Sequence, residues 1–260
     1  MHRPLIDIII PIQSETHKLV SCVASLEKHT TNYRLHVYED PSLNVSEARQ
    51  AAMNLSCVGD LVCFLDDDVI LMQDSWLDNL YAKMLEAGAT VAYGEEHWNG
   101  KHIINEYEEI SQVSFGPAAC MLIDKTKIPA GVDWDKYIGL RSGWLGGDFE
   151  EVDFAYQLLA KGAKLIGTNT SVFHHMDKPK MLDFMKTDRH KTCRIMHFLI
   201  KIKNDILFEP EFFRHLAYVQ ASSHNDLMLK PGQSLKKCFH QVLLDNNISH
   251  YPAFKNWNLV

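Results

Sequence analysis

Three consecutive carboxylates, Asp66, Asp67 and Asp68, directly follow the apolar run Cys63–Leu65. On extended backbone, alternate side chains point to the same side, so we expect Asp66 and Asp68 to share one face while Asp67 points away. Carboxylate pairs suit Mg²⁺ and Mn²⁺, which keep coordination positions open for phosphate. Aspartate is also common in solvated turns and at helix starts, so the triplet alone also allows a purely structural interpretation.

Two adjacent histidines, His174 and His175, are the next candidate ligands. They follow an apolar stretch around Leu165 and Ile166 that is predicted to be a strand. Imidazole binds divalent cations, so a histidine after this strand is a reasonable third ligand beside an Asp-x-Asp pair. The chain has 14 histidines, however, and a structural role is the alternative.

A second group of acids follows two glycines, Gly146 and Gly147. Its members are Asp148, Glu150, Glu151 and Asp153. Glycine lets the backbone approach a ligand closely, and neighbouring acids raise the pKa of a carboxylate toward values useful to a general base. Capping of the helix predicted from about residue 150 to 161 is the alternative. Trp144, in the same loop, is expected either to stack on an acceptor ring or to pack in the core.

Several other catalytic signatures are missing from the sequence. There is no GxxxxGK[ST] loop, and no GxGxxG follows the first predicted strand. A bound nucleotide would therefore need a metal ion to neutralise most of its diphosphate charge. The patterns GxSxG, HExxH and CxxC are also missing, which argues against a nucleophile elbow and against a zinc site.

Strand-like and helix-like segments alternate over the first hundred residues. This order predicts an α/β fold with a mostly parallel sheet flanked by helices. The expected strands are Leu5–Pro11, Arg34–Asp40, Leu61–Asp68 and Ala89–Glu95. Ligands of such sheets bind at the carboxyl ends of the strands. Acids stand at three of these ends, at Asp40, at Asp66–Asp68 and at Glu95 with Glu96, so they are expected to converge.

The composition is that of a soluble globular protein. Apolar residues make up 46% of the 260 residues, and the net charge of −7 does not favour a nucleic-acid-binding protein. Six widely spread cysteines indicate reduced thiols and a cytoplasmic protein, with peripheral membrane association or a phage protein in a host cytoplasm as alternatives. The N-terminal apolar run is too short for a signal peptide or a membrane span.

The order of these motifs resembles GT-A fold glycosyltransferases, in particular the large family-2 type. The segments that carry the resemblance are IDIIIPIQSETHKLVSCVASL, VYED, SEARQAAM, CFLDDDVIL, FGPAACMLIDKTKI, WLGGDFEEVDFAYQLLAKGAKL and SVFHH. They lie between about residues 5 and 178. The resemblance implies a nucleotide-sugar transferase domain over residues 1–178, and the helical pattern that follows is expected to form a C-terminal extension, 179–260, packed on it.

Position by position, the resemblance assigns some of these residues to nucleotide binding and others to cation binding. The residues assigned to nucleotide binding are Pro11, Gln13, Asp40, Arg49, Asp66 and Asp67. Asp40 would contact the base, and Arg49 the base or the diphosphate. A Mn²⁺ or Mg²⁺ ion would be held by Asp66, Asp68 and one of the two histidines, His174 or His175.

The resemblance also places a general base on the helix after the glycines. Glu151 matches the acid that serves as base in inverting members, eleven residues before Gly162, and Glu150 and Asp148 are the further candidates. The residues assigned to acceptor binding are Trp144, Gly146 and Gly147.

The implied enzyme is metal-dependent and transfers a sugar from a nucleoside diphosphate-sugar, a UDP-sugar, to a hydroxyl, with inversion. The acceptor would be a glycan, a lipid-linked glycan or a modified DNA base. A nucleotidyltransferase and a non-catalytic carbohydrate-binding protein of the same fold are the alternatives. Departures from the family pattern are Gln13 for Tyr, Glu151 for Asp and Gln157 for Arg, and they concern the donor more than the fold.

Overall fold

The computed structural model describes residues 4–12, 17–39, 45–98, 101–102, 106–134 and 150–176. Several positions singled out in the sequence fall outside these ranges, namely Gln13, Asp40, Trp144, Gly146, Gly147 and Asp148. Residues 179–260 also lie outside them, so the division into two domains stays a prediction.

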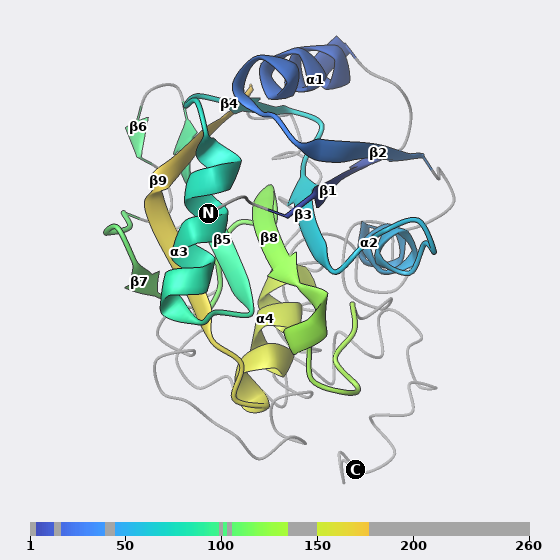
Figure 1. The fold of residues 1–260 in the computed structure, drawn as a ribbon, viewed down its shortest axis with the longest axis vertical. Coiled ribbons are helices and arrows are strands. Elements are labelled where there is room, and N and C mark those ends of the chain that lie inside the picture. The colour runs from blue at the N-terminus through green and yellow to red at the C-terminus, as the bar shows by residue number, and fades with distance from the viewer. Residues whose placement is uncertain are drawn as a thin grey trace, which may run out of the picture.

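Nine strands and four α-helices make up the described part of the chain (Figure 1). The helices are α1 (His17–His29), α2 (Val45–Met53), α3 (Trp76–Ala87) and α4 (Glu150–Ala160), and a 3-10 turn covers Lys125–Lys127. The strands are β1 (Ile6–Ile12), β2 (Tyr33–Glu39), β3 (Leu61–Leu65), β4 (Val69–Leu71), β5 (Val91–Trp98), β6 (Lys101–His102), β7 (Ser111–Gln112), β8 (Cys120–Asp124) and β9 (Leu165–His175).

The strands form one mixed sheet in the order β2-β1-β3-β8-β5-β9-β4, with β6 on β5 and β7 on β9. The two longest ladders are parallel, with seven residue pairs between β1 and β2 and eight between β5 and β9. Strand β8 runs antiparallel to both β3 and β5 and so joins the two parallel groups. The α/β prediction is confirmed. The expected convergence of acids is seen for Asp66, Asp68 and Glu96, which all lie beside His175, whereas Asp40 lies outside the described residues.

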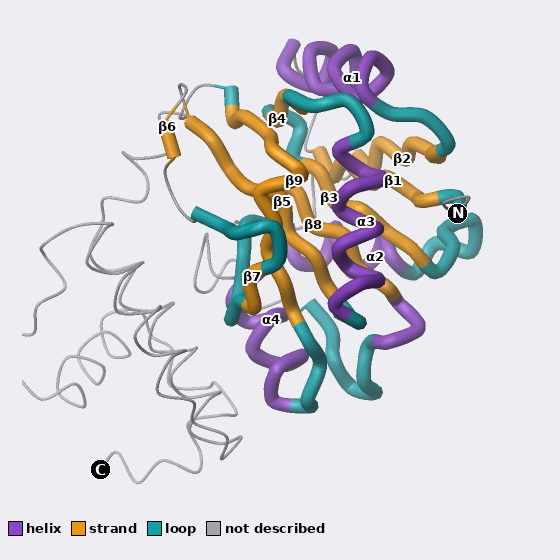
Figure 2. The backbone as a smooth tube through the Cα atoms, turned by 60° about the vertical axis from the view of Figure 1, so that its left-hand side comes forward, coloured by secondary structure: helices purple, strands orange, loops and turns teal. Residues whose placement is uncertain are grey.

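Helices pack on both faces of this sheet (Figure 2). Successive side chains of a strand point to opposite faces. Accordingly, Ile8 of β1 lies in a buried cluster with residues of α1 and α3, including Trp76. The next residue, Ile9, lies in a second cluster with residues of α2 and α4, including Phe154. Because both faces are covered, β1 reads in the sequence as a continuous apolar run rather than an alternating one.

Strand β9 is longer than the sequence predicts. It was expected around Leu165 and Ile166, with the histidines after it, but it continues to His175. Its last residues pair antiparallel with β4 and parallel with β5, and such pairing between distant segments leaves no local sequence signal. The two histidines are therefore strand residues with fixed, opposite directions.

The pairing of β5 with β9 shifts between Gly94 and Glu95. Gly94 pairs with Thr168, whereas Glu95 pairs with Val172, so the residues between, 169–171, bulge out of the ladder. Gly94 makes this possible, because a Cβ there would lie 3.0 Å from the carbonyl oxygen of Ser171. The bulge sets which residues of β9 stand beside the end of β5.

None of the helices in the described ranges combines the length and the apolar character needed to cross a bilayer.

Candidate active site

The aspartate triplet forms a turn between β3 and β4. The amide of Val69 donates to the carbonyl of Asp66 at 3.3 Å, which closes a four-residue turn. The amide of Asp66 donates to Ala119 at 3.3 Å, and the amide of Met176 donates to Asp68 at 2.7 Å, so the turn is held at both ends. The expectation of extended backbone through Asp68 is therefore wrong, because the chain turns here to enter β4.

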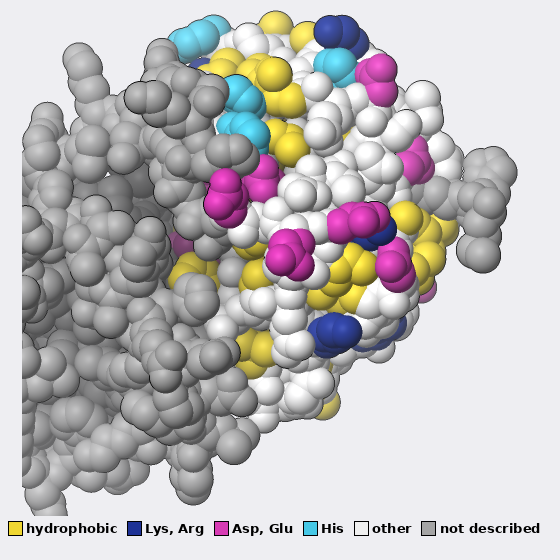
Figure 3. Space-filling model, turned by 90° about the vertical axis from the view of Figure 1, so that its left-hand side faces the viewer, with side chains coloured by type: hydrophobic (Ala, Val, Ile, Leu, Met, Phe, Trp, Pro, Cys, Tyr) yellow, Lys and Arg dark blue, Asp and Glu magenta, His cyan; other side chains and the backbone are white. Residues whose placement is uncertain are grey.

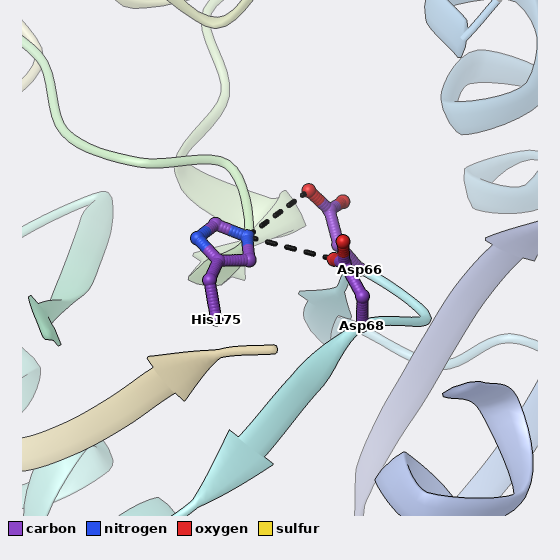
Figure 4. A group of neighbouring side chains, drawn as sticks. All are labelled: Asp66, Asp68 and His175. Carbon is purple, nitrogen blue, oxygen red and sulfur yellow. Dashed lines mark ion pairs between the residues drawn. The ribbon is translucent and has the colours of Figure 1, made fainter. Parts of the chain in front are cut away.

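The turn nevertheless brings together the residues expected to bind a cation. Nε2 of His175 lies 4.0 Å from Oδ2 of Asp66 and 3.7 Å from Oδ1 of Asp68 (Figure 4). One ligand atom from each of the three residues lies within 4.8 Å of the other two, the one such group found among the described residues. Around a cation with bonds of about 2.1 Å, neighbouring ligand atoms are roughly 3.0 Å apart and opposite ones roughly 4.2 Å. The two distances of His175 to the aspartates, 4.0 and 3.7 Å, lie between these values.

The chemistry of the three donors also suits a divalent cation. Carboxylate oxygens suit Mg²⁺ and Mn²⁺, and an imidazole nitrogen shifts the preference toward Mn²⁺. Burial and the negative charge of Asp66 raise the pKa of Asp68, which shows that the two acids repel each other. A cation placed between them would relieve this repulsion.

A buried glutamate of β5 orients His175. Oε1 of Glu96 lies 2.5 Å from Nδ1 of the histidine, which leaves Nε2 facing the aspartates. Burial disfavours the charged imidazole, but the carboxylates of Asp66 and Glu96 outweigh burial and raise the pKa of His175 to about 10. The ring is therefore protonated at neutral pH, and a cation bound at Nε2 would replace that proton.

The neighbouring His174 points to the other face of the sheet. It stands opposite His97 of β5, and the two ring centroids are 5.5 Å apart. Burial, and then the nearby His97, lower the pKa of His174. Figure 3 shows histidine side chains gathered at the upper end of one face of the molecule. Of the two histidines considered as ligands, the structure brings His175 to the aspartates.

A lysine that the sequence did not single out also reaches this group. Nζ of Lys18, in the first turn of α1, lies 3.3 Å from Oδ2 of Asp68. The sequence offered no motif for it, because only the packing of α1 beside β4 brings this turn to the aspartates. Its positive charge lies beside the same carboxylate that would bind a cation.

On the other side of the turn, Arg49 of α2 joins the aspartates to helix α4. Its Nη2 donates to Oδ1 of Asp66 at 3.2 Å, and its Nη1 donates to Oε1 of Glu150 at 2.8 Å. The side chain is only 3% exposed. Burial raises the pKa of Asp66, but His175 and Arg49 outweigh burial and lower it. Two residues predicted separately are thus parts of one network.

The candidate bases stand in the first turn of α4. Glu150 is nearly buried against Arg49, whereas Glu151 is half-buried. Burial raises the pKa of Tyr93 well above its usual value, and the charges of Tyr107 and Glu151 add to this shift. Further along, Gln157 donates from Nε2 to Oδ2 of the buried Asp153 at 2.8 Å, which indicates a structural role for this pair.

Two residues assigned to the nucleotide are also described. Pro11 is half-buried at the carboxyl end of β1, opposite Tyr38 of β2. Asp67 is half-buried in the turn itself, between the two aspartates of the cation group. Their contacts with a nucleotide stay predictions.

No family model and no curated protein matches the sequence, whereas solved structures do. GalNAc-T7, crystallised with UDP, GalNAc and Mn²⁺, matches with a TM-score of 0.56 and 10% identity, over 93% of this chain and 55% of that one. S. aureus TarS matches with a TM-score of 0.60 and 11% identity, over 95% of this chain and 49% of that one.

A shorter TarS chain, 1–349, matches with a TM-score of 0.61 and 11% identity, over 93% of this chain and 80% of that one. The chain spans about half the length of GalNAc-T7 and of the longer TarS chain. At this level of identity the likeness concerns the fold, and it agrees with the order of motifs in the sequence. The chain has the GT-A glycosyltransferase fold.

Proposed function

We propose that this protein is a metal-dependent glycosyltransferase that uses a UDP-sugar as donor and a hydroxyl group as acceptor. The observation that carries the proposal is the group of Asp66, Asp68 and His175, where the end of β3 meets the ends of β5 and β9. Ligands of α/β sheets bind at such strand ends. GalNAc-T7, a protein with the same fold, was crystallised with UDP, GalNAc and Mn²⁺, which supports the choice of donor and ion.

The three residues of this group would hold Mn²⁺ or Mg²⁺. A cation bound there supplies positive charge that stabilises the leaving diphosphate. The nucleotide would lie along the neighbouring strand ends, against residues assigned to it from the sequence. These are Pro11, Gln13, Asp40, Arg49, Asp66 and Asp67.

Glu151 is the proposed general base. In the transfer step, the acceptor oxygen forms a bond to the anomeric carbon as the bond from that carbon to the diphosphate oxygen breaks. The electron pair of the broken bond stays on the diphosphate, and the acceptor proton passes to the Glu151 carboxylate. Glu150 is less suited to this role, because its Oε1 accepts a hydrogen bond from Arg49. Attack from the face opposite the leaving group inverts the anomeric centre.

The acceptor side is proposed from the sequence alone. Trp144, Gly146 and Gly147 would border the acceptor, with Asp148 as a further candidate base. A glycan, a lipid-linked glycan and a modified DNA base all present a hydroxyl that this chemistry can use.

A panel of UDP-sugars incubated with Mn²⁺ or Mg²⁺ tests the proposal, with release of UDP as the measurement. We expect one donor to be turned over or hydrolysed, and EDTA to abolish the reaction. Formation of UTP from a UDP-sugar and pyrophosphate would instead identify a nucleotidyltransferase. Tight binding of a UDP-sugar or a glycan without any turnover would identify a non-catalytic protein.

Two adjacent aspartates provide a matched pair of variants for the metal site. Asp68→Asn removes a proposed ligand and should weaken Mn²⁺ binding by about 100-fold, whereas Asp67→Asn should keep the Mn²⁺ Kd within about threefold. Equal Mn²⁺ affinity in the two variants would contradict the assignment.

A further inference from the structure

Arg49 makes side-chain hydrogen bonds to both the metal-site turn and the helix of the candidate bases, and it does so while buried. One amino group of the guanidinium donates to Asp66 and the other donates to Glu150, at 3.2 and 2.8 Å. Three elements, α2, the turn after β3 and α4, are therefore joined through a single planar group.

Two aromatic rings fix where that group lies. The guanidinium carbon is 5.1 Å from the ring centroid of Trp134 and 6.0 Å from that of Phe64. Trp134 in turn stacks on Phe154 of α4, with ring centroids 4.4 Å apart and planes 3° from parallel. Its indole Nε1 lies 3.3 Å from the sulfur of Met53 in α2. The guanidinium thus lies in a packed setting built from both helices.

The two carboxylate oxygens of Asp66 also have different partners. Oδ1 accepts from Arg49, and Oδ2 is the oxygen turned toward His175 in the cation group. A carboxylate held at one oxygen by a fixed donor presents its other oxygen in a fixed direction.

We infer that Arg49 is a positioning residue that couples the metal site to the first turn of α4. This inference rests on the proposed function and adds a route by which the helix of Glu150 and Glu151 acts on the cation group. Glu150 shares the positive charge of Arg49, so Asp66 is neutralised only in part and keeps its affinity for a cation. If the charge of Glu150 is lost, the positive charge of Arg49 interacts with Asp66 alone. The group of Asp66, Asp68 and His175 then binds a cation less tightly.

Mn²⁺ titration of four proteins tests this coupling: wild type, Glu150→Gln, Arg49→Met and the double variant. We expect Glu150→Gln to raise the Mn²⁺ Kd about fivefold in the wild-type background and less than about twofold in the Arg49→Met background, since contacting charges couple by about this much. A control, Glu86→Gln on α3, removes the same charge far from the site and should leave the Kd unchanged.

An effect of Glu150→Gln that is the same size with and without Arg49 would overturn the inference, because charge acting through space needs no bridge. The proposed function would still stand in that case, since UDP-sugar turnover tests it separately. Conversely, coupling without turnover of any UDP-sugar would retain the inference and refute the activity. Absence of Mn²⁺ binding in the wild type would overturn both.

Arg49→Lys supplies a second variant that keeps the charge. Lysine lacks the planar fork and cannot serve both carboxylates in this geometry. We expect it to keep the Mn²⁺ Kd within about threefold while kcat falls by about 100-fold, as misplacement of catalytic groups does. If the Arg49→Met variant does not fold, Arg49→Lys replaces it among the four proteins compared by Mn²⁺ titration. A wild-type kcat in Arg49→Lys would contradict the positioning role.

Discussion

Nδ1 of His175 lies 2.5 Å from Oε1 of Glu96, and this contact decides which ring nitrogen faces Asp66 and Asp68. Glu96 stands in β5 and the aspartates follow β3, so the histidine of β9 is held from one side and presented to the other. The neighbouring glutamate, Glu95, makes the corresponding contact with His97 at 2.8 Å. Two adjacent acids of one strand thus serve two different histidines.

The first prediction concerns this pair of glutamates. Glu96→Gln should weaken Mn²⁺ binding by about 10- to 100-fold, the usual effect of losing the carboxylate behind a metal-binding histidine. Glu95→Gln is a matched control, since both side chains are nearly buried and both contact a histidine. Its Mn²⁺ Kd, measured by calorimetry, should stay within about threefold of the wild type. Similar losses in both variants would indicate a general disturbance of β5.

The second prediction compares the two adjacent histidines. His175→Gln should weaken Mn²⁺ binding by at least about 100-fold, because it removes a ligand rather than the group behind it. His174→Gln should leave the affinity nearly unchanged, since the residue faces His97 on the other side of the sheet. A metal titration of both variants decides the matter. Loss of binding in His174→Gln alone would reverse the assignment.

The third prediction uses Lys18, whose ammonium lies beside Asp68. Lys18→Met should strengthen Mn²⁺ binding about two- to fivefold at low salt, because a competing positive charge is removed from a partly exposed carboxylate. Added salt should reduce the gain. Lys28→Met, on an exposed position of the same helix, is the control and should change little. Weaker binding in Lys18→Met would show that the lysine supports the site instead.

The fourth prediction concerns stability at low pH. Asp7, at the start of β1, is 1% exposed and accepts hydrogen bonds from Arg34, His36 and the amide of Gly59 at 2.7 to 2.8 Å. Burial raises the pKa of Asp7, but these hydrogen bonds outweigh burial and lower it. The carboxylate therefore stabilises the fold above its unfolded pKa of about 3.9, and this contribution is lost as the pH falls through the lowered folded pKa.

Urea unfolding of the wild type and of Asp7→Asn between pH 3 and 7 measures this contribution. The variant should lose about 1–3 kcal/mol at pH 7, the usual effect of disrupting a buried hydrogen-bonded group. The difference between the two proteins should shrink toward the acid end of the range. A difference that does not depend on pH would show that the charge of Asp7 contributes nothing.

Much of the fold followed from local patterns in the sequence. The apolar run at β1, the alternating pattern of β2 and the glycine that ends α3 each reflect packing or backbone geometry within a few residues. The meeting of the aspartates with a late histidine followed from the rule that ligands gather at the carboxyl ends of strands. These predictions needed no knowledge of which strands pair.

What the sequence did not reveal depends on contacts between distant residues. The turn at Asp66–Asp68 exists because β4 leaves to pair with β9, some hundred residues later in the chain. The contact of Arg49 with Glu150 joins residues 101 positions apart, and that of Lys18 with Asp68 joins residues 50 apart. No spacing within a single motif encodes such pairs. The sequence likewise did not show which of His174 and His175 faces the aspartates, because this depends on the register of β9.

The bulge between Thr168 and Val172 decides which side chains at the end of β9 face Asp66 and Asp68. Strand side chains alternate, so a shift of one residue exchanges the two faces of a strand. The three residues 169–171 are held outside the ladder, partly by Asn79, which donates to the carbonyl of Thr170 at 2.9 Å. Before the bulge, Gly94 pairs with Thr168, and after it Glu95 pairs with Val172, so three extra residues of β9 lie between successive pairs of the ladder. Because three is an odd number, His174 and His175 point to the faces opposite to those they would take in an unbroken ladder.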